Sequence, residues 1–155
     1  MDGFYGTYEH TVDSKGRFSI PARIRQALPR EAPNQIVFVH GMETCLYGFS
    51  VPAFKRTEEK LLSLGIGSPE ARAVLEMFGA TATPCDLDSQ GRVLVPPKML
   101  SLVGIRENVT IVGTVLYVAL WNPDNYAARF SEVKPSYQAG MQRFFSGSSV
   151  PGERD

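Results

Sequence analysis

Residues 12 to 21 read Val-Asp-Ser-Lys-Gly-Arg-Phe-Ser-Ile-Pro, and residues 87 to 96 read Leu-Asp-Ser-Gln-Gly-Arg-Val-Leu-Val-Pro. Looser matches follow in the same order, between residues 36–41 and 109–113 and between residues 49–54 and 121–126. Matches in one order over this length indicate a tandem duplication of a small unit. Five positions of the first pair of stretches are identical: Asp13/Asp88, Ser14/Ser89, Gly16/Gly91, Arg17/Arg92 and Pro21/Pro96.

Each copy of this stretch predicts a strand, a tight turn and a second strand. In Asp-Ser-Lys/Gln-Gly the aspartate can accept hydrogen bonds from the backbone N–H groups ahead of it, and the glycine supplies a positive φ. A strand follows at once, so the pattern predicts a β-hairpin. Pro21 and Pro96 then open short helices, because proline suits a first helical position. Two more strands and a closing helix complete each unit, which predicts a mostly β fold with short helices, of the α+β class.

The repeats and the segments around them predict five regions. Leucine and phenylalanine side chains recur at helical spacing between the two units, which favours packing over a ligand site. The C-terminal end is rich in glycine, serine and proline and is expected to be disordered. The regions are a first unit at 7–54, a helical linker at 55–82, a second unit at 83–126, a C-terminal helical segment at 127–145 and a tail at 146–155.

The composition is that of an ordinary soluble globular protein. Of 155 residues, 43% are hydrophobic and 21% charged, and 16 basic residues balance 16 acidic ones. A neutral chain gives no overall electrostatic support to nucleic-acid binding, so such a function must rest on local clustering. Cys45 and Cys85 lack the spacing of metal ligands and predict two reduced, buried thiols. No apolar leader begins the chain, and the most apolar stretch, 109–121, is too short to cross a bilayer, so we expect a cytoplasmic protein.

Catalytic chemistry has no support in the motifs. The two histidines, His10 and His40, lie in no nucleophile motif, and the chain has no nucleophile elbow, zinc-protease motif or phosphate-binding glycine loop. Asp86 and Asp88 alternate along a strand and could resemble a metal pair, but Asp88 matches the turn residue Asp13. We therefore expect no enzyme, and no metal, cofactor or small-molecule substrate.

The arginines of the repeated stretch are the candidate binding residues. Strand side chains alternate in direction, so Arg17 and Ser19 point outward if Phe18 and Ile20 point inward. A guanidinium at the edge of a hairpin can donate two hydrogen bonds to guanine O6 and N7 in the major groove. The alternative is that Asp13 and Arg17 form only a surface ion pair, worth under about 1 kcal/mol. Duplication does not exclude this alternative, because a turn that builds the fold would also be kept.

Basic residues cluster in the first unit. Five basic residues and one acid lie between Asp13 and Arg30, a local charge of about +4, whereas the charges of residues 86–107 cancel. The predicted DNA-binding set combines base-reading arginines with neighbours that bind phosphates. This set is Lys15, Arg17, Arg23, Arg25, Arg92 and Lys98, and the turn-forming residues are Asp13, Gly16, Asp88 and Gly91.

Asp-Ser-Lys-Gly-Arg followed by an apolar–x–apolar–Pro stretch resembles the signature hairpin of AbrB-like swapped-hairpin domains. Two copies joined by a helical segment resemble the MraZ family of bacterial transcriptional regulators, from about Phe4 to Phe130. The resemblance implies that the two AbrB-like units intertwine as an intramolecular pseudo-dimer. It maps the family's motif arginines onto Arg17 and Arg92 and its basic turn position onto Lys15.

The resemblance also implies a function. Such a protein binds double-stranded DNA at short G-rich repeats upstream of its own division and cell-wall gene cluster. It assembles into a homo-oligomeric ring and acts in the cytoplasm, at the nucleoid. A basic patch repeated around a ring would give a multivalent surface despite the neutral chain.

Two departures from the family pattern concern the DNA-binding face. Gln90 stands in the second turn where Lys15 stands in the first, which argues against equal roles for the two motifs. Phe4-Tyr5-Gly6 lacks the basic residue that often precedes this glycine in the family.

The alternatives to a DNA-binding regulator are an antitoxin-like module and a purely structural ring-forming scaffold. Antitoxins usually carry one hairpin unit and a long partner-wrapping tail, whereas here the second copy occupies that space.

Overall fold

The computed structural model describes residues 2–152, and the chain divides into two compact units between Pro123 and Asp124. The first unit contains both copies of the repeat, and the second contains nearly all of the last helix. The elements are β1 (Thr7–Thr11), β2 (Arg17–Ser19), α1 (Ala22–Gln26), β3 (Gln35–His40), β4 (Leu46–Phe49), α2 (Val51–Leu62), α3 (Pro69–Thr81), β5 (Thr83–Asp86), β6 (Arg92–Leu94), α4 (Pro97–Leu102), β7 (Asn108–Gly113), β8 (Val118–Trp121) and α5 (Pro123–Ser146).

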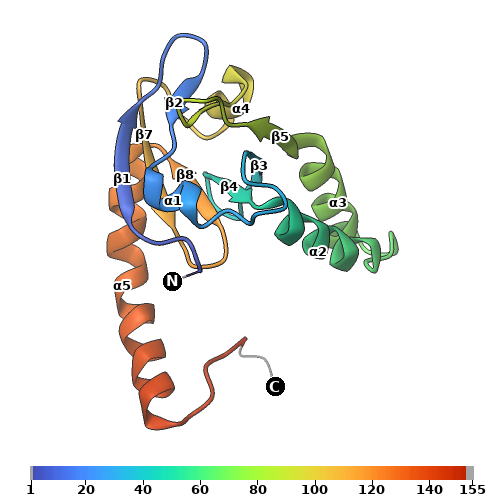
Figure 1. Cartoon of the computed structure of the whole chain (residues 1–155). Helices are drawn as coiled ribbons and strands as arrows, with labels where there is room; N and C mark the ends of the chain where they lie inside the picture. Colours follow the sequence, from blue (N-terminus) through green and yellow to red (C-terminus); the bar gives the residue numbers. More distant parts are fainter. Residues whose placement is uncertain (1, 153–155) are drawn as a thin grey trace. The chain divides into compact units, whose positions relative to one another are not determined.

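A six-stranded antiparallel sheet joins the two repeats, in the order β1-β7-β8-β4-β3-β5. The first strand of each repeat pairs with the third strand of the other: β1 with β7, and β5 with β3. Figure 1 shows β1 running alongside β7, which belongs to the other repeat. Strands β4 and β8 pair at the centre of the sheet. The implied intertwined pseudo-dimer is thereby confirmed.

The predicted hairpin is built differently from a simple one. Its second arms, β2 and β6, pair with each other across the two repeats and form a separate two-stranded sheet. Each arm is held to its own first arm mainly at the turn, where Asp13 N–H donates to the Arg17 carbonyl at 2.9 Å and Asp88 N–H donates to the Arg92 carbonyl at 2.8 Å. A three-residue arm buries little by itself, so exchanging arms brings its apolar residue into a core that both repeats share.

This shared core contains matching residues from both repeats. Phe18 and Val93 point into it from β2 and β6, and the apolar residues before the two prolines follow them. Helix α1 starts after Pro21 and buries Ile24, whereas α4 starts after Pro96 and buries Met99 and Leu100. Both predicted prolines precede the short helices, but they stand at the N-cap and not at the first helical position, which Ala22 and Pro97 occupy.

The linker forms two helices, α2 and α3, which lie next to each other in Figure 1. Ser50 and Ser68 cap them, because each hydroxyl accepts a hydrogen bond from a backbone N–H of the first turn. Phe54 and Phe78 stack across the pair with their ring centroids 5.7 Å apart. The predicted packing is incomplete, since no residue of α2 is buried and Thr81 is the one buried residue of α3.

Helix α5 carries the C-terminal segment, and it continues through Pro135. Several of its aromatic side chains are exposed, among them Phe130, Tyr137, Phe144 and Phe145. Of the expected disordered tail at 146–155, residues 153–155 lie outside the described residues. No helix within residues 2–152 combines the length and the apolar character that crossing a membrane requires. The same residues hold no cluster of three or more histidine, cysteine or acidic side chains that could bind a metal ion.

Candidate nucleic-acid interface

The two motif arginines lie on one face of the ribbon formed by β2 and β6. Arg17 pairs with Leu94 and Ser19 pairs with Arg92. Residues directly opposite each other in a ladder share a face, as do residues two apart in a strand, so all four side chains point the same way. The residues between them, Phe18 and Val93, point to the core, and the side chains of Arg17 and Arg92 stay 35% and 37% exposed.

The ribbon geometry sets the spacing of the two arginines. They occupy diagonal positions in the ladder, which places their Cα atoms about 7–8 Å apart. Stacked base pairs lie about 3.4 Å apart, so this spacing corresponds to roughly two base-pair steps. The major groove is wide enough to admit a two-stranded ribbon.

Each arginine is oriented by the aspartate of its own turn. Arg17 Nε donates to Asp13 Oδ2 at 2.8 Å, and Arg92 Nε donates to Asp88 Oδ2 at 3.0 Å. The ion pair weighed from the sequence is therefore present. Each ion pair uses only the Nε group of its arginine. The Nη groups of both arginines therefore remain available, and within residues 2–152 they donate no hydrogen bond. A guanidinium held by its Nε edge can still donate two parallel hydrogen bonds to a base.

The same aspartates organise the turn backbone. Asp13 Oδ1 accepts hydrogen bonds from the backbone N–H groups of Lys15 and Arg17, both at 2.9 Å. Hydrogen bonds from the backbone N–H of Arg17 and, to a smaller extent, from its side chain lower the pKa of Asp13 to about 2. The pKa of Asp88 is lowered too, first by the backbone N–H of Arg92. Both carboxylates thus stay charged and keep their arginines in place at neutral pH.

The two turns lie at opposite ends of the ribbon, and each holds the far end of the other arm. The carbonyl of Gly16 accepts from Val95 N–H at 3.1 Å, and the carbonyl of Gly91 accepts from Ile20 N–H at 3.0 Å. Both glycines have positive φ, +90° and +76°, as the turn motif predicts. The face therefore runs from Lys15, in the first turn, to Gln90, in the second.

The other predicted basic residues occupy different surroundings. Lys15 is exposed at the tip of the first turn, and Lys98 is exposed on α4. Arg23 is exposed on α1, and its guanidinium lies 5.9 Å from the centre of the Tyr5 ring. Within the described residues none of these three cations is paired with a carboxylate, so each can bind a phosphate without losing such a partner.

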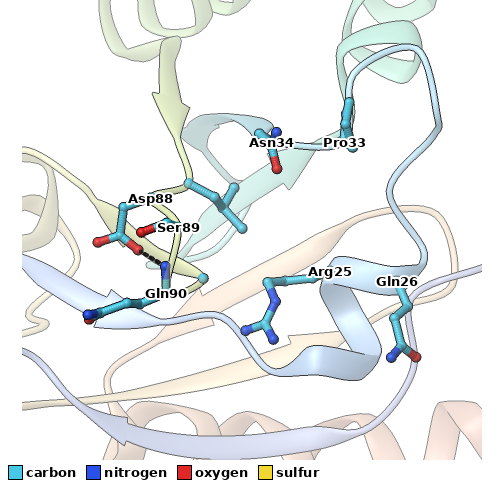
Figure 2. A pocket seen from close by; sticks show the side chains of 9 residues that line it. Arg25, Gln26, Pro33, Asn34, Asp88, Ser89 and Gln90 are labelled. Atoms are coloured by element: carbon cyan, nitrogen blue, oxygen red, sulfur yellow. Dashed lines mark hydrogen bonds between the residues drawn. The ribbon is translucent and has the colours of Figure 1, made fainter.

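Arg25 has a structural contact instead. Its Nη1 donates to the Ile20 carbonyl at 2.7 Å, and its guanidinium lies over Gly91, where a β-carbon would otherwise stand. Figure 2 shows Arg25 beside the second turn, on the edge of a cavity of about 400 Å³ that Asn34 and Asp88 also line. Helical spacing places Arg25 between the buried and the outward faces of the helix, and it cannot show that the other repeat's turn lies against this side chain. We therefore leave Arg25 out of the DNA-binding surface.

Two residues of this face, Ser19 and Leu94, are absent from the predicted set, and Leu94 is the more exposed of them. Leu94 lies directly opposite Arg17, and it is 47% exposed. Strand alternation could have identified Leu94 from the sequence: if Val93 and Val95 point to the core, Leu94 between them points outward. Both valines are in fact buried.

The chain is similar in sequence to proteins of one family. It matches the MraZ protein family, whose description likens it to antitoxins, twice in tandem over residues 4–77 and 77–146. A protein named transcriptional regulator MraZ from Thermomicrobium roseum is 38% identical over 126 residues, which cover 81% of this chain and 86% of that protein. Proteins of the same name from Caldicellulosiruptor bescii and Caldicellulosiruptor saccharolyticus are 37% and 31% identical. They cover 78% and 89% of this chain, and 82% and 94% of their own lengths. With both copies of the repeat matched, the chain belongs to the MraZ family.

Proposed function

We propose that this chain is a sequence-specific DNA-binding transcriptional regulator, without catalytic activity, that reads guanines with Arg17 and Arg92. The observation that carries the proposal is their placement on one exposed face, each held through Nε by an aspartate of its own turn. Arginines that served only as ion-pair partners of Asp13 and Asp88 would not need to lie on the same face. The names of the relatives, all transcriptional regulators, support the same function.

The proposed binding mode combines base reading with phosphate contacts. The ribbon enters the major groove, and Arg17 and Arg92 each donate two hydrogen bonds to a guanine. Lys15 is exposed in the first turn, and Arg23 and Lys98 are exposed on the helices that follow β2 and β6; in this binding mode they bind phosphates, which fixes the register without reading sequence. The DNA then neutralises the local basic cluster of the first repeat, although the chain as a whole has no net charge.

The proposal also covers where the protein acts, which DNA elements it binds and how it assembles. The chain acts in the cytoplasm, at the nucleoid, on short repeated elements upstream of its own division and cell-wall gene cluster. A homo-oligomeric ring presents several ribbons to successive elements. Linking weak sites in this way raises the overall affinity through effective concentration.

A titration of the purified protein against the DNA upstream of its own gene tests the proposal. It compares wild type with Arg17→Ala and Arg92→Ala at several salt concentrations, and light scattering follows assembly. One bidentate arginine–guanine contact contributes about 1–3 kcal/mol, so each variant should lose about 5- to 150-fold in affinity for specific DNA. Arg56→Ala is the matched control, because it removes an exposed arginine from α2, which is not part of the ribbon. Equal binding to random DNA, or indifference to both arginines, would refute the proposal.

An antitoxin-like module or a ring-forming scaffold without specific DNA binding is the second candidate. Two features favour protein contacts: the exposed aromatic residues of α5, and an apolar groove of about 440 Å³ that Tyr47, Phe49 and Met77 help to line. If the arginine variants assemble normally and DNA binding is absent in all proteins, including wild type, this candidate replaces the first.

A further inference from the structure

We infer that Leu94 is a specificity-determining residue that contacts the 5-methyl group of a thymine beside the base pair read by Arg17. The inference rests on the proposed function and deepens it, because it adds a base that no arginine recognises. It follows from the position, exposure and chemistry of one side chain.

The position of Leu94 is fixed by the ladder. It lies directly opposite Arg17, and the Cβ atoms of opposite residues are about 4.5–5.5 Å apart. Leu94 is 47% exposed, whereas Val93 and Val95 on either side of it are buried. A shift of the strand by one residue would expose both valines to bury one leucine, so the side chain is held on the arginine face.

The chemistry of that face points to thymine. Among the bases, thymine alone presents a methyl group in the major groove, and apolar side chains contact it there. Neighbouring base pairs lie about 3.4 Å apart, so a residue beside Arg17 faces the next base pair along the groove. Single exposed leucines are common on protein surfaces, but this one lies among the groups that approach DNA. An apolar group on that face gains by burial against another apolar group.

Only the second repeat can make this contact. The counterpart of Leu94 in the first repeat is Ser19, which lies opposite Arg92. One end of the ribbon therefore presents arginine with leucine, and the other presents arginine with serine. The preferred DNA element should need a thymine beside only one of its two guanines, and its orientation on the ribbon is thereby set.

The experiment begins by selecting preferred sites from random DNA with the wild-type protein. Each thymine of the selected site is then replaced by deoxyuridine, which removes only the methyl group, and affinity is measured by fluorescence anisotropy. At the one contacted position, deoxyuridine should weaken wild type about fourfold, the effect of about one buried methyl group. Leu94→Ser should bind thymine and deoxyuridine equally there, whereas Leu116→Ser, which alters an exposed leucine of another loop, should keep the fourfold difference.

A gain-of-contact variant gives an independent readout. Ser19→Leu places a second leucine opposite Arg92, so sites selected by this variant should contain an additional thymine beside the second guanine. Thermal unfolding of each variant tests whether the fold is retained. An unchanged selection by Ser19→Leu would count against the inference.

The outcomes separate the two proposals. If wild type enriches no site, or Arg17→Ala enriches the same site as wild type, the proposed function fails and the thymine contact with it. If Arg17→Ala loses the site but deoxyuridine has no effect at any position, only the role of Leu94 is overturned. The same holds if Leu94→Ser retains the fourfold preference for thymine.

Discussion

The guanidinium of Arg25, in the first repeat, lies between the Cα of Gly91 and the carbonyl of Ile20, to which it donates at 2.7 Å. At the matching place in the other half, a β-carbon on Gly16 would meet the carbonyl of Val95 directly. The residue that corresponds to Arg25 is the buried Leu100. An arginine is thus inserted at one of two otherwise equivalent turn contacts, which makes the two ends of the ribbon unequal.

We predict that Arg25→Ala relieves part of the destabilisation caused by Gly91→Ala but none of that caused by Gly16→Ala. Gly91→Ala should destabilise by about 1–2 kcal/mol because of its positive φ, and Gly16→Ala should cost more, because its β-carbon would also meet the backbone carbonyl of Val95. Gly91→Ala must also displace Arg25, and that cost disappears if Arg25 is already alanine. In urea unfolding, Gly91→Ala with Arg25→Ala should therefore cost less than the sum of the single changes. Gly16→Ala with Arg25→Ala is the control and should be additive within about 0.5 kcal/mol; additivity in both pairs would contradict the contact.

A second prediction concerns acid stability. The pKa of Asp13 is held at about 2, below the ordinary value of 3.8, chiefly by the backbone N–H and the side chain of Arg17. A depressed folded-state pKa adds stability that is present above about pH 4 and is lost as the pH falls towards 2. Wild type should therefore lose stability over this range more steeply than Asp13→Asn, measured by urea unfolding midpoints.

The control for this acid titration is Glu31→Gln, which removes an exposed carboxylate elsewhere in the first repeat. It should follow the wild-type curve between pH 4 and pH 2. A carbon-detected NMR titration of the Asp13 carboxyl reports the group directly. A midpoint near pH 4 would show that Arg17 does not hold the carboxylate in solution.

The unequal turns predict unequal salt dependence of DNA binding. Lys15→Gln removes one phosphate-binding cation, so the slope of log affinity against log salt should become shallower by about 0.9. Gln90→Lys should make it steeper by a similar amount, because the second turn then carries the charge of the first. Lys55→Gln, on the exposed side of α2, should leave the slope unchanged. A slope that ignores both turn substitutions would place the turns away from the DNA backbone.

The thiol of Cys85 should be unreactive in the folded protein. Burial, with a smaller effect of the Asp86 charge, raises its pKa to about 11, so at pH 8 about one thiol in a thousand is ionised. In a Cys45→Ser background, a disulfide reagent should modify Cys85 rapidly only after unfolding. Ser148→Cys supplies an exposed thiol as the reference. Equal rates for the two thiols in the folded protein would contradict the burial of Cys85.

Much of the local structure could be predicted because it depends on residues close together in the chain. The aspartate and glycine of each turn, the prolines that open α1 and α4, and the outward direction of Arg17 all follow from turn chemistry, fixed φ and strand alternation. The residue pattern alone, however, predicts a simple hairpin. The intertwined pairing was implied only by the family resemblance.

The sequence by itself determined the duplication, the two turns and the alternation that turns both arginines outward. Only the tertiary structure decided that β2 pairs with β6, that Arg17 and Arg92 share a face with Leu94, and that Arg25 supports the opposite turn. The physical reason is that a short arm makes similar backbone hydrogen bonds with its own hairpin or with the other copy. The choice between them is set by apolar surface buried in a core assembled from residues about 75 positions apart, which no local pattern records.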